Sequence, residues 1–454
     1  MPDPVRCSAR AVAVALALGA STAHAQPARP VSDSAGTTAV AFVRSLERGA
    51  WDTAAQLAAL TPPAEVTTEA LLRGVWTQLV GQLGPLASLV PAPATANGES
   101  RIVDLGARFE RSEVTLRVVV GPAGKVTGFW VTPPRAPAYT PPPYAAPARV
   151  REDEIAFGAV LPLPATVTLP RGATGRVPAV VLVHGSGPLD RDARVGANRP
   201  FRDLALGLAA RGIAVLRYDK RTYVHPRALA GQRVTLEVEV IDDALAALVA
   251  ARAYPGVDPA RVFVVGHSIG ATFSPDIADR DGHVAGVALL APAGRSISQV
   301  ALEQLDYLIE RARAAGQPTA SYEPVRAQLA ALVARRLPRD TPVLGAPAWY
   351  WYDLDDRRPL ELAGASRVPA LAIFGGRDYQ VTAADVDAWR KTFAGRTNAT
   401  VEMRPAVNHL LVPGRGPSSP EEYQARPGHV EEAIVERLAR WILAQPPVAP
   451  PSGR

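Results

Sequence analysis

The sequence predicts an α/β fold, a mostly parallel sheet with helices on both faces, that follows a small α+β domain. Two features of the second half predict the sheet: short continuous apolar runs, and helical patterns between several of them. A third feature, a proline-rich stretch over residues 133–149, separates this half from a first part that differs in pattern. The 454 residues, 48% of them hydrophobic and 20% charged, suit one large and one small domain and exclude global disorder.

The first 25 residues have the pattern of a secretory signal peptide. Arg6 and Arg10 precede a short apolar run over residues 11–20, and Ala23-His24-Ala25 supplies an A-x-A cleavage site. The apolar run is too short to span a bilayer. We therefore expect cleavage after Ala25 and a secreted or periplasmic product.

The composition of the chain excludes several kinds of catalytic chemistry and of binding partner. Cys7 is the only cysteine and lies in the signal segment, so the mature chain would have no disulfide, cysteine nucleophile or cysteine–zinc site. The formal charge is only +6, and no basic run suits a phosphate backbone, so nucleic acid is not an expected partner. After signal removal, no segment is long and apolar enough to cross a membrane.

The pattern of residues 31–132 predicts the small α+β domain. Helical patterns occur over residues 37–49, 51–60 and 67–83, and alternating strand patterns follow over 101–120 and 125–131. The domain contains no Cys and no His, so nothing in it suggests chemistry. Residues 133–149 then predict a semi-rigid linker, because seven of the fifteen residues from Pro133 to Pro147 are proline.

Residues 150–446 predict the large α/β domain. Its strands are the continuous apolar runs at residues 179–183, 213–217, 262–265, 287–290 and 370–374, with a last strand at 399–404. Helical patterns over residues 201–211 and 240–251 lie between them. Residues 296–367 are too many for one crossover connection, so we expect them to form a helical insertion over one end of the sheet.

The motif Gly266-His267-Ser268-Ile269-Gly270 follows one predicted strand directly and precedes a helical stretch. It is a G-x-S-x-G sequence in the strand–turn–helix context that a nucleophilic serine requires. The flanking glycines permit a turn sharp enough to expose the hydroxyl. Ser268 is therefore the predicted nucleophile.

A serine hydroxyl is a weak nucleophile unless a base, held by an acid, takes its proton. His409 is the best base because it lies in a loop beyond the last strand, in Asn408-His409-Leu410. Asp378 is the best acid because Gly375-Gly376-Arg377-Asp378 follows a buried strand, where open α/β sheets place their sites. The chain order Ser268, Asp378, His409 completes a predicted catalytic triad.

The run His184-Gly185-Ser186-Gly187-Pro188 follows the first buried strand. We expect the backbone N–H of Ser186 or Gly187 to join that of Ile269 in an oxyanion hole. A dinucleotide-binding loop is the alternative, but the third glycine of that motif is missing.

Two further groups of residues carry weaker predictions. Asp190-Arg191-Asp192 and residues 217–221 form a polar cluster, which we interpret as salt bridges that brace the oxyanion loop, with substrate binding as the alternative. The run Trp349-Tyr350-Trp351-Tyr352 fits the core of the insertion. From it and from the residue after Asp378 we take Trp349, Trp351 and Tyr379 as candidate substrate-binding residues.

These motifs resemble those of secreted bacterial α/β-hydrolase esterases that carry a small N-terminal domain of unknown function. The resemblance is densest at residues 181–192, 212–221, 266–270, 375–381 and 408–410. It implies an α/β-hydrolase fold, activity on short acyl esters, and the roles of nucleophile, acid and base for Ser268, Asp378 and His409. One departure is Ile269, where such sequences often have an acidic residue or glycine.

We therefore expect a serine carboxylesterase that cleaves short-to-medium acyl esters through an acyl-enzyme. The predicted partner is a small-molecule ester, no metal or organic cofactor is implied, and a homodimer is left open. A peptidase or amidase that uses the same triad is the alternative enzyme. An envelope binding module is the alternative of another class, and a serine rather than an aspartate at position 268 argues against haloalkane and epoxide hydrolases.

Overall fold

The computed structural model describes residues 34–60, 66–110, 113–132, 139–425 and 427–448, and the predicted signal segment lies outside them. The chain divides into two compact units, Met1–Pro137 and Ala138–Arg454. Among the helices of these described ranges, none combines the length and the apolar content needed to cross a bilayer.

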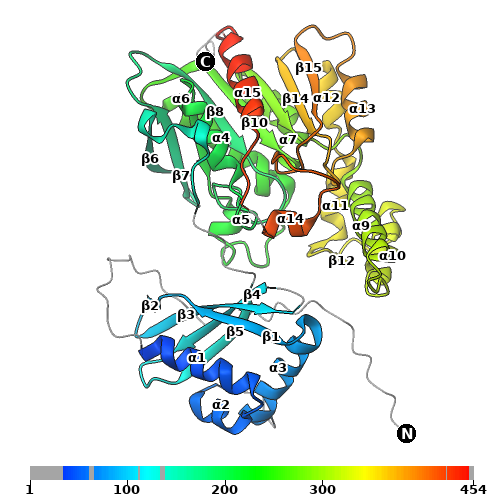
Figure 1. Ribbon diagram of the computed structural model, residues 1–454. Coiled ribbons are helices and arrows are strands. Elements are labelled where there is room, and N and C mark those ends of the chain that lie inside the picture. Colours follow the sequence, from blue (N-terminus) through cyan, green and yellow to red (C-terminus); the bar gives the residue numbers. More distant parts are fainter. Residues whose placement is uncertain (1–33, 61–65, 111–112, 133–138, 426, 449–454) are drawn as a thin grey trace. The chain divides into compact units, whose positions relative to one another are not determined.

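The first unit packs helices against an antiparallel sheet (Figure 1). Phe42 of the first helix and Trp76 of the third are buried against strand residues such as Leu105 and Leu116. The strand order is β1-β3-β4-β5, and β2 pairs with β3. The elements are α1 (Ser34–Glu47), α2 (Trp51–Leu57), α3 (Thr68–Leu83), β1 (Leu86–Pro91), β2 (Thr95–Asn97), β3 (Ser100–Phe109), β4 (Glu113–Val120) and β5 (Val126–Thr132).

An eight-stranded sheet forms the centre of the second unit. Its order is β15-β14-β11-β10-β8-β9-β7-β6, and neighbours are parallel except that β7 pairs antiparallel with both β9 and β6. The strands are β6 (Val150–Phe157), β7 (Leu163–Pro170), β8 (Val177–Val183), β9 (Ala214–Tyr218), β10 (Val257–His267), β11 (Gly286–Leu290), β14 (Ala370–Gly375) and β15 (Ala399–Arg404). The predicted mostly parallel sheet is confirmed.

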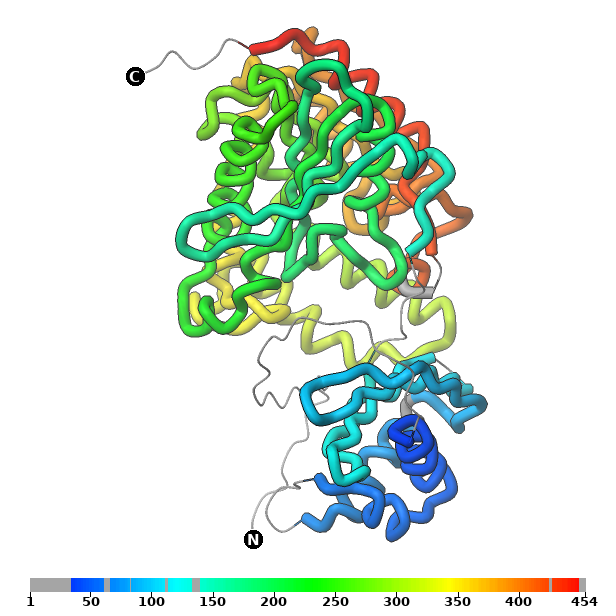
Figure 2. The backbone as a smooth tube through the Cα atoms, turned by 90° about the vertical axis from the view of Figure 1, so that its left-hand side faces the viewer, coloured from blue at the N-terminus to red at the C-terminus, as the bar shows by residue number. Residues whose placement is uncertain are grey.

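Helices cover both faces of this sheet, because successive side chains of a buried strand point to opposite sides. Val180 and Leu182 of β8 belong to the core on the face that includes α4 and α15, whereas Val181 and Val183 belong to the core on the other face, which includes α6 and α13. Figure 2 follows the chain through this unit from cyan β6 to red α15. The helices are α4 (Pro200–Ala209), α5 (Arg221–Val224), the π-helical turn η3 (Glu237–Ile241), α6 (Asp242–Ala253), α7 (Ile269–Thr272), α8 (Ser274–Asp281), α13 (Ala383–Thr392), α14 (Pro420–Ala425) and α15 (Glu432–Ala444).

The proline-rich stretch differs from the predicted linker over most of its length. Residues 139–149 contain the short 3-10 turns η1 (Pro143–Ala145) and η2 (Pro147–Arg149) and pack on the large domain. The Tyr139 hydroxyl donates to Asp203 at 2.7 Å, and the Tyr144 hydroxyl donates to the Val430 carbonyl at 2.7 Å. These tyrosines attach the end of the stretch to the second unit.

The predicted insertion over residues 296–367 contains four helices and a short hairpin. Its own small core includes Leu329, Val343 and Tyr352. The elements are α9 (Ile297–Ala314), α10 (Glu323–Val333), β12 (Pro342–Val343), β13 (Ala346–Pro347), α11 (Ala348–Asp356) and α12 (Pro359–Ala365).

Candidate active site

Ser268 lies in a sharp turn between β10, which ends at His267, and α7, which begins at Ile269. Its backbone has φ 55° and ψ −122°, a conformation that non-glycine residues rarely adopt and that is typical of functional turns. Glycine is required at both flanking positions, because nearby backbone atoms leave no room for a side chain there. A Cβ at Gly266 would lie 2.4 Å from the Gly270 carbonyl oxygen, and a Cβ at Gly270 would lie 2.4 Å from a backbone oxygen of the loop after β8.

Asp378 and His409 form a buried hydrogen-bonded pair. His409 Nδ1 lies 2.6 Å from Asp378 Oδ2, and the two side chains are 5% and 1% exposed. The other carboxylate oxygen, Oδ1, accepts the N–H groups of Gln380 at 2.7 Å and Val381 at 3.0 Å. With its proton on Nδ1, the imidazole has Nε2 free to accept a proton from a nucleophile.

The loop that carries His409 is held by its neighbours. The Asn408 side-chain oxygen accepts the N–H groups of Leu410 at 3.0 Å and Val412 at 3.1 Å. His267, the residue before Ser268, donates from Nε2 to the His409 carbonyl at 2.8 Å. Burial lowers the pKa of His267 to about 3, so this imidazole is neutral at physiological pH. The serine turn and the histidine loop are thus joined directly.

The structure therefore brings the three predicted triad residues to one end of the sheet. Asp378 follows β14, Ser268 follows β10, and His409 follows β15. Between the described residues Ser268 and His409 there is no side-chain hydrogen bond, although the side chain of His267, the residue before Ser268, bonds to the His409 carbonyl. Catalytic hydrogen bonds are often long before substrate binds, so this geometry is compatible with a triad.

The loop after β8 lies against the serine turn. A Cβ at Gly185 would approach the Ser268 Cβ to 3.2 Å. The structure does not support Gly187 as an oxyanion donor, because its N–H donates to Glu239 Oε1 at 3.2 Å. The N–H groups of Ser186 and Ile269 have no hydrogen bond to any other described residue. These two donors remain the predicted oxyanion hole.

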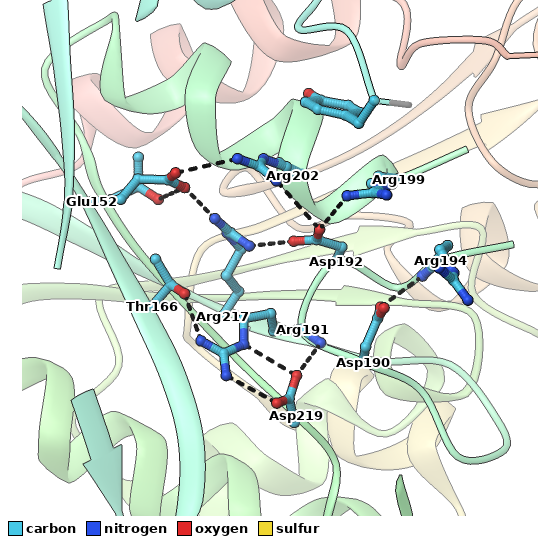
Figure 3. A network of polar contacts seen from close by, with 12 residues as sticks. Glu152, Thr166, Asp190, Arg191, Asp192, Arg194, Arg199, Arg202, Arg217 and Asp219 are labelled. Carbon is cyan, nitrogen blue, oxygen red and sulfur yellow. Dashed lines mark hydrogen bonds and ion pairs between the residues drawn. The ribbon is translucent and has the colours of Figure 1, made fainter. Parts of the chain in front are cut away.

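The predicted polar cluster is a set of ion pairs around the same loop (Figure 3). Arg191 donates two hydrogen bonds from its guanidinium to Asp219, at 3.1 and 2.9 Å, and a third from its backbone N–H at 2.7 Å. Arg217 binds both Asp192 and Glu152. Because these charges pair with one another, the arrangement favours bracing of the loop over binding of a substrate.

The candidate substrate-binding aromatic residues fall in different surroundings. The Trp351 indole N–H donates to the Val343 carbonyl at 3.2 Å, inside the insertion. The Arg233 guanidinium lies 4.3 Å from the Trp349 ring centroid. Tyr379 stacks on Tyr307 with ring centroids 4.9 Å apart, and burial, with the nearby Asp378 charge, raises its pKa to about 12. Of the three, Tyr379 is the one adjacent in the chain to a triad residue, Asp378.

Sequence reasoning missed Glu239, a buried carboxylate in η3 that contacts the loop after β8. Lys220 Nζ donates to its Oε1 at 2.6 Å, and the Tyr350 hydroxyl donates to its Oε2. The available signal was an acidic residue directly before the apolar helical pattern over residues 240–251.

The chain was also compared with known proteins. A sequence model described as the alpha/beta hydrolase family matches residues 180–448. Esterase EstD of Thermotoga maritima is 36% identical over 402 residues, which cover 88% of this chain and 94% of that protein.

Two of the solved structures that match the chain are an esterase and a peptidase. Est1E from Butyrivibrio proteoclasticus is 17% identical with a TM-score of 0.41, covering 64% of this chain and 99% of that one. A puromycin-hydrolyzing peptidase of Mycobacterium tuberculosis is 17% identical with a TM-score of 0.45, covering 79% of this chain and 48% of the peptidase.

Proposed function

The chain belongs to the alpha/beta hydrolase family, and from that premise we propose that it is a serine esterase, which hydrolyses carboxylic esters through an acyl-enzyme. The observation that carries the proposal is the His409–Asp378 pair, joined through His267 to the strained turn of Ser268. The similarity to Esterase EstD supports esters as the substrate class. Short-to-medium acyl chains remain the expected range.

In the first half-reaction the Ser268 Oγ attacks the ester carbonyl carbon while His409 Nε2 takes the hydroxyl proton. The carbonyl oxygen becomes an oxyanion, which the N–H groups of Ser186 and Ile269 stabilise. Each such donor contributes about 3–4 kcal/mol toward the transition state. The C–O bond to the alcohol then breaks, and His409 gives its proton to the leaving alkoxide.

In the second half-reaction water replaces the alcohol. His409 takes a proton from the water, the hydroxide attacks the acyl carbonyl, and collapse of the tetrahedral intermediate returns the proton to Ser268 Oγ. The products are the carboxylic acid and the alcohol. Asp378 keeps its position throughout, because its oxygens accept hydrogen bonds from His409 and from two backbone N–H groups. It orients the imidazole and stabilises the imidazolium.

The test is the initial rate of p-nitrophenyl butyrate hydrolysis by the protein, by Ser268→Ala and by Ser321→Ala. Ser321 is an exposed serine outside the site and serves as the matched control. We expect Ser268→Ala to lower kcat/KM by at least about 10³-fold and Ser321→Ala to leave it unchanged. Equal rates in all three proteins would overturn the proposal, and faster cleavage of the matching p-nitroanilide would favour the amidase alternative.

From the N-terminal pattern we further propose that the protein is exported and that its signal is removed after Ala25. Intact-mass measurement of the protein from the periplasm or the culture medium should give a chain that begins at Gln26. A full-length chain confined to the cytoplasm would contradict this.

A further inference from the structure

We propose that Glu239 is a positioning residue for the oxyanion hole: with Lys220 it sets the direction of the Ser186 N–H, and through Tyr350 it connects the insertion to that loop. The inference rests on the proposed esterase function. Glu239 makes no hydrogen bond to Ser268 or His409; its bonds are to Gly187, Lys220 and Tyr350, so its influence passes through the loop after β8.

Lys220 fixes one peptide plane of this loop. Its Nζ donates to the Gly185 carbonyl oxygen at 3.0 Å and to Glu239 Oε1 at 2.6 Å. The Gly185 carbonyl and the Ser186 N–H belong to the same trans peptide, so they point in opposite directions. A cation that holds the carbonyl therefore directs the Ser186 N–H away from Lys220. It also polarises the peptide, which makes that N–H a stronger donor.

Glu239 fixes the next peptide plane. Its Oε1 accepts the Gly187 N–H at 3.2 Å in addition to the Lys220 ammonium. The loop is thus held at a carbonyl on one side of Ser186 and at an N–H on the other. Between these two tethers the Ser186 N–H has no hydrogen bond to a described residue. Since Gly185 lies against Ser268, the unbonded donor is next to the nucleophile.

The insertion contributes Tyr350, the third group that binds the Glu239 carboxylate. The Tyr350 hydroxyl, from α11, donates to Glu239 Oε2, and Tyr350 is 9% exposed. Burial raises the pKa of Tyr350 far above its usual value, so the hydroxyl keeps its proton and acts as the donor. The insertion helix that follows the β12–β13 hairpin is thereby linked to the oxyanion loop through one carboxylate.

Glu239 is an ionised anchor, not a substrate ligand. Burial by itself would raise the pKa of Glu239, but Lys220, the Tyr350 hydroxyl and the Gly187 N–H together lower it below its ordinary value. Both carboxylate oxygens are already bonded to these groups, and the residue is 8% exposed. The carboxylate therefore has little capacity for a direct contact with substrate.

The experiment compares Glu239→Gln and Tyr350→Phe with Tyr352→Phe. Tyr352 lies on the same helix, but its hydroxyl donates to the Leu337 carbonyl within the insertion, so it is a matched control. For each variant we would measure kcat and KM for p-nitrophenyl butyrate, and the inhibition constant of butylboronic acid. The boronic acid forms a tetrahedral adduct with the nucleophilic serine and places an oxygen in the oxyanion hole.

We expect Glu239→Gln to lower kcat about 10- to 100-fold, because a misdirected donor loses much of its transition-state stabilisation. KM should change less than about threefold, and boronic acid affinity should fall in parallel with kcat. Tyr350→Phe should lower both by a smaller factor, and Tyr352→Phe should change neither. Unchanged kcat and boronic acid affinity in folded Glu239→Gln would overturn the inference, as would an effect confined to KM.

A second variant covers the case in which Glu239→Gln does not fold because Lys220 is left as an unpaired buried charge. Lys220→Met/Glu239→Gln removes both charges and should show the same parallel loss of kcat and boronic acid affinity. Ser268→Ala is assayed beside them. Serine-dependent turnover that the Glu239 and Lys220 changes leave intact would refute only this inference, whereas turnover that does not depend on Ser268 would refute the esterase proposal with it.

Discussion

Two charged networks hold the loop after β8, and they differ chiefly in burial. In one, the side chains of Lys220 and Glu239 are 2% and 9% exposed. In the other, those of Arg191 and Asp219 are 19% and 13% exposed, and that of the outer partner Glu154 is 71% exposed, although the neighbouring Arg217, which pairs with Asp192, is only 3% exposed. The adjacent residues Asp219 and Lys220 supply one member to each network. The same loop is thus braced by a nearly dry ion pair and by a partly hydrated one.

The difference in burial assigns the two networks different tasks. Removing two charges from water costs several kcal/mol per ion, so a buried pair contributes little net stability even when its geometry is good. Such a pair is better suited to holding groups in a defined orientation. The Arg191–Asp219 contact, with two guanidinium hydrogen bonds and partial access to water, avoids most of that cost and is the better candidate for a stabilising contact.

The largest expected effect comes from Lys220→Met. It leaves the Glu239 carboxylate buried without its cation, and breaking a buried pair in this way costs about 3–5 kcal/mol. Urea unfolding of the second unit would measure the loss. In Lys220→Met/Glu239→Gln no buried charge remains unpaired, so most of the stability should return. If single and double variants were equally unstable, lost packing rather than an unpaired charge would be the cause.

The contrast between the networks also shows which contacts can be predicted from the sequence and which cannot. Ser268, Asp378 and His409 were predicted because each lies in a local pattern next to a buried strand, and the structure places all three at one end of the sheet. The predicted Arg191 and Asp219 cluster likewise follows two strand ends. In these cases the contacts follow from the order of the strands in the sheet. Continuous apolar runs in the sequence indicate where those strands lie.

Glu239 and β6 could not be predicted in the same way. Glu239 acts on Gly187, 52 residues earlier, through a contact that no local pattern encodes. The strand β6 begins Val150-Arg151-Glu152-Asp153-Glu154 and lies at the edge of the sheet, so it lacks the continuous apolar run of a central strand. Two of its polar side chains are explained by ion pairs: Glu154 pairs with Arg191 of the partly hydrated network, and Glu152 pairs with Arg217, whose side chain is 3% exposed.

A smaller effect is expected at Asp219→Asn. The substitution keeps the shape of the side chain but removes the charge that Arg191 binds, and hydrogen bonds to charged groups contribute about 1.5–3 kcal/mol. Because both side chains retain some contact with water, we expect a loss of about 1–2 kcal/mol in urea unfolding. The kcat of folded Asp219→Asn should fall less than that of Glu239→Gln. A larger fall would make the hydrated network the principal positioning element.

The buried network should also be visible in the pH dependence of stability. The pKa of Glu239 is lowered from 4.5 in the folded protein, so the unfolded chain takes up this proton at the higher pH. Its contribution is therefore complete above pH 4.5 and is lost as the pH falls through the folded-state pKa. Between pH 6 and pH 4, Lys220→Met/Glu239→Gln should lose less stability than the unsubstituted protein. If stability fell equally with pH in the two proteins, the pKa of Glu239 would not differ between the folded and the unfolded chain.

The smallest effect is expected at Glu154→Gln, at the outer rim of the hydrated network. Glu154 pairs with Arg191, but its side chain is 71% exposed, and exposed ion pairs contribute about 0–1 kcal/mol. We expect a loss below about 0.5 kcal/mol that disappears in 1 M NaCl, where screening acts within about 3 Å. The cost of Lys220→Met should persist in the same salt, because buried charges are screened little. If Glu154→Gln lowered the free energy of unfolding as much as Asp219→Asn does, solvent exposure would not explain the difference in strength between the ion pairs around this loop.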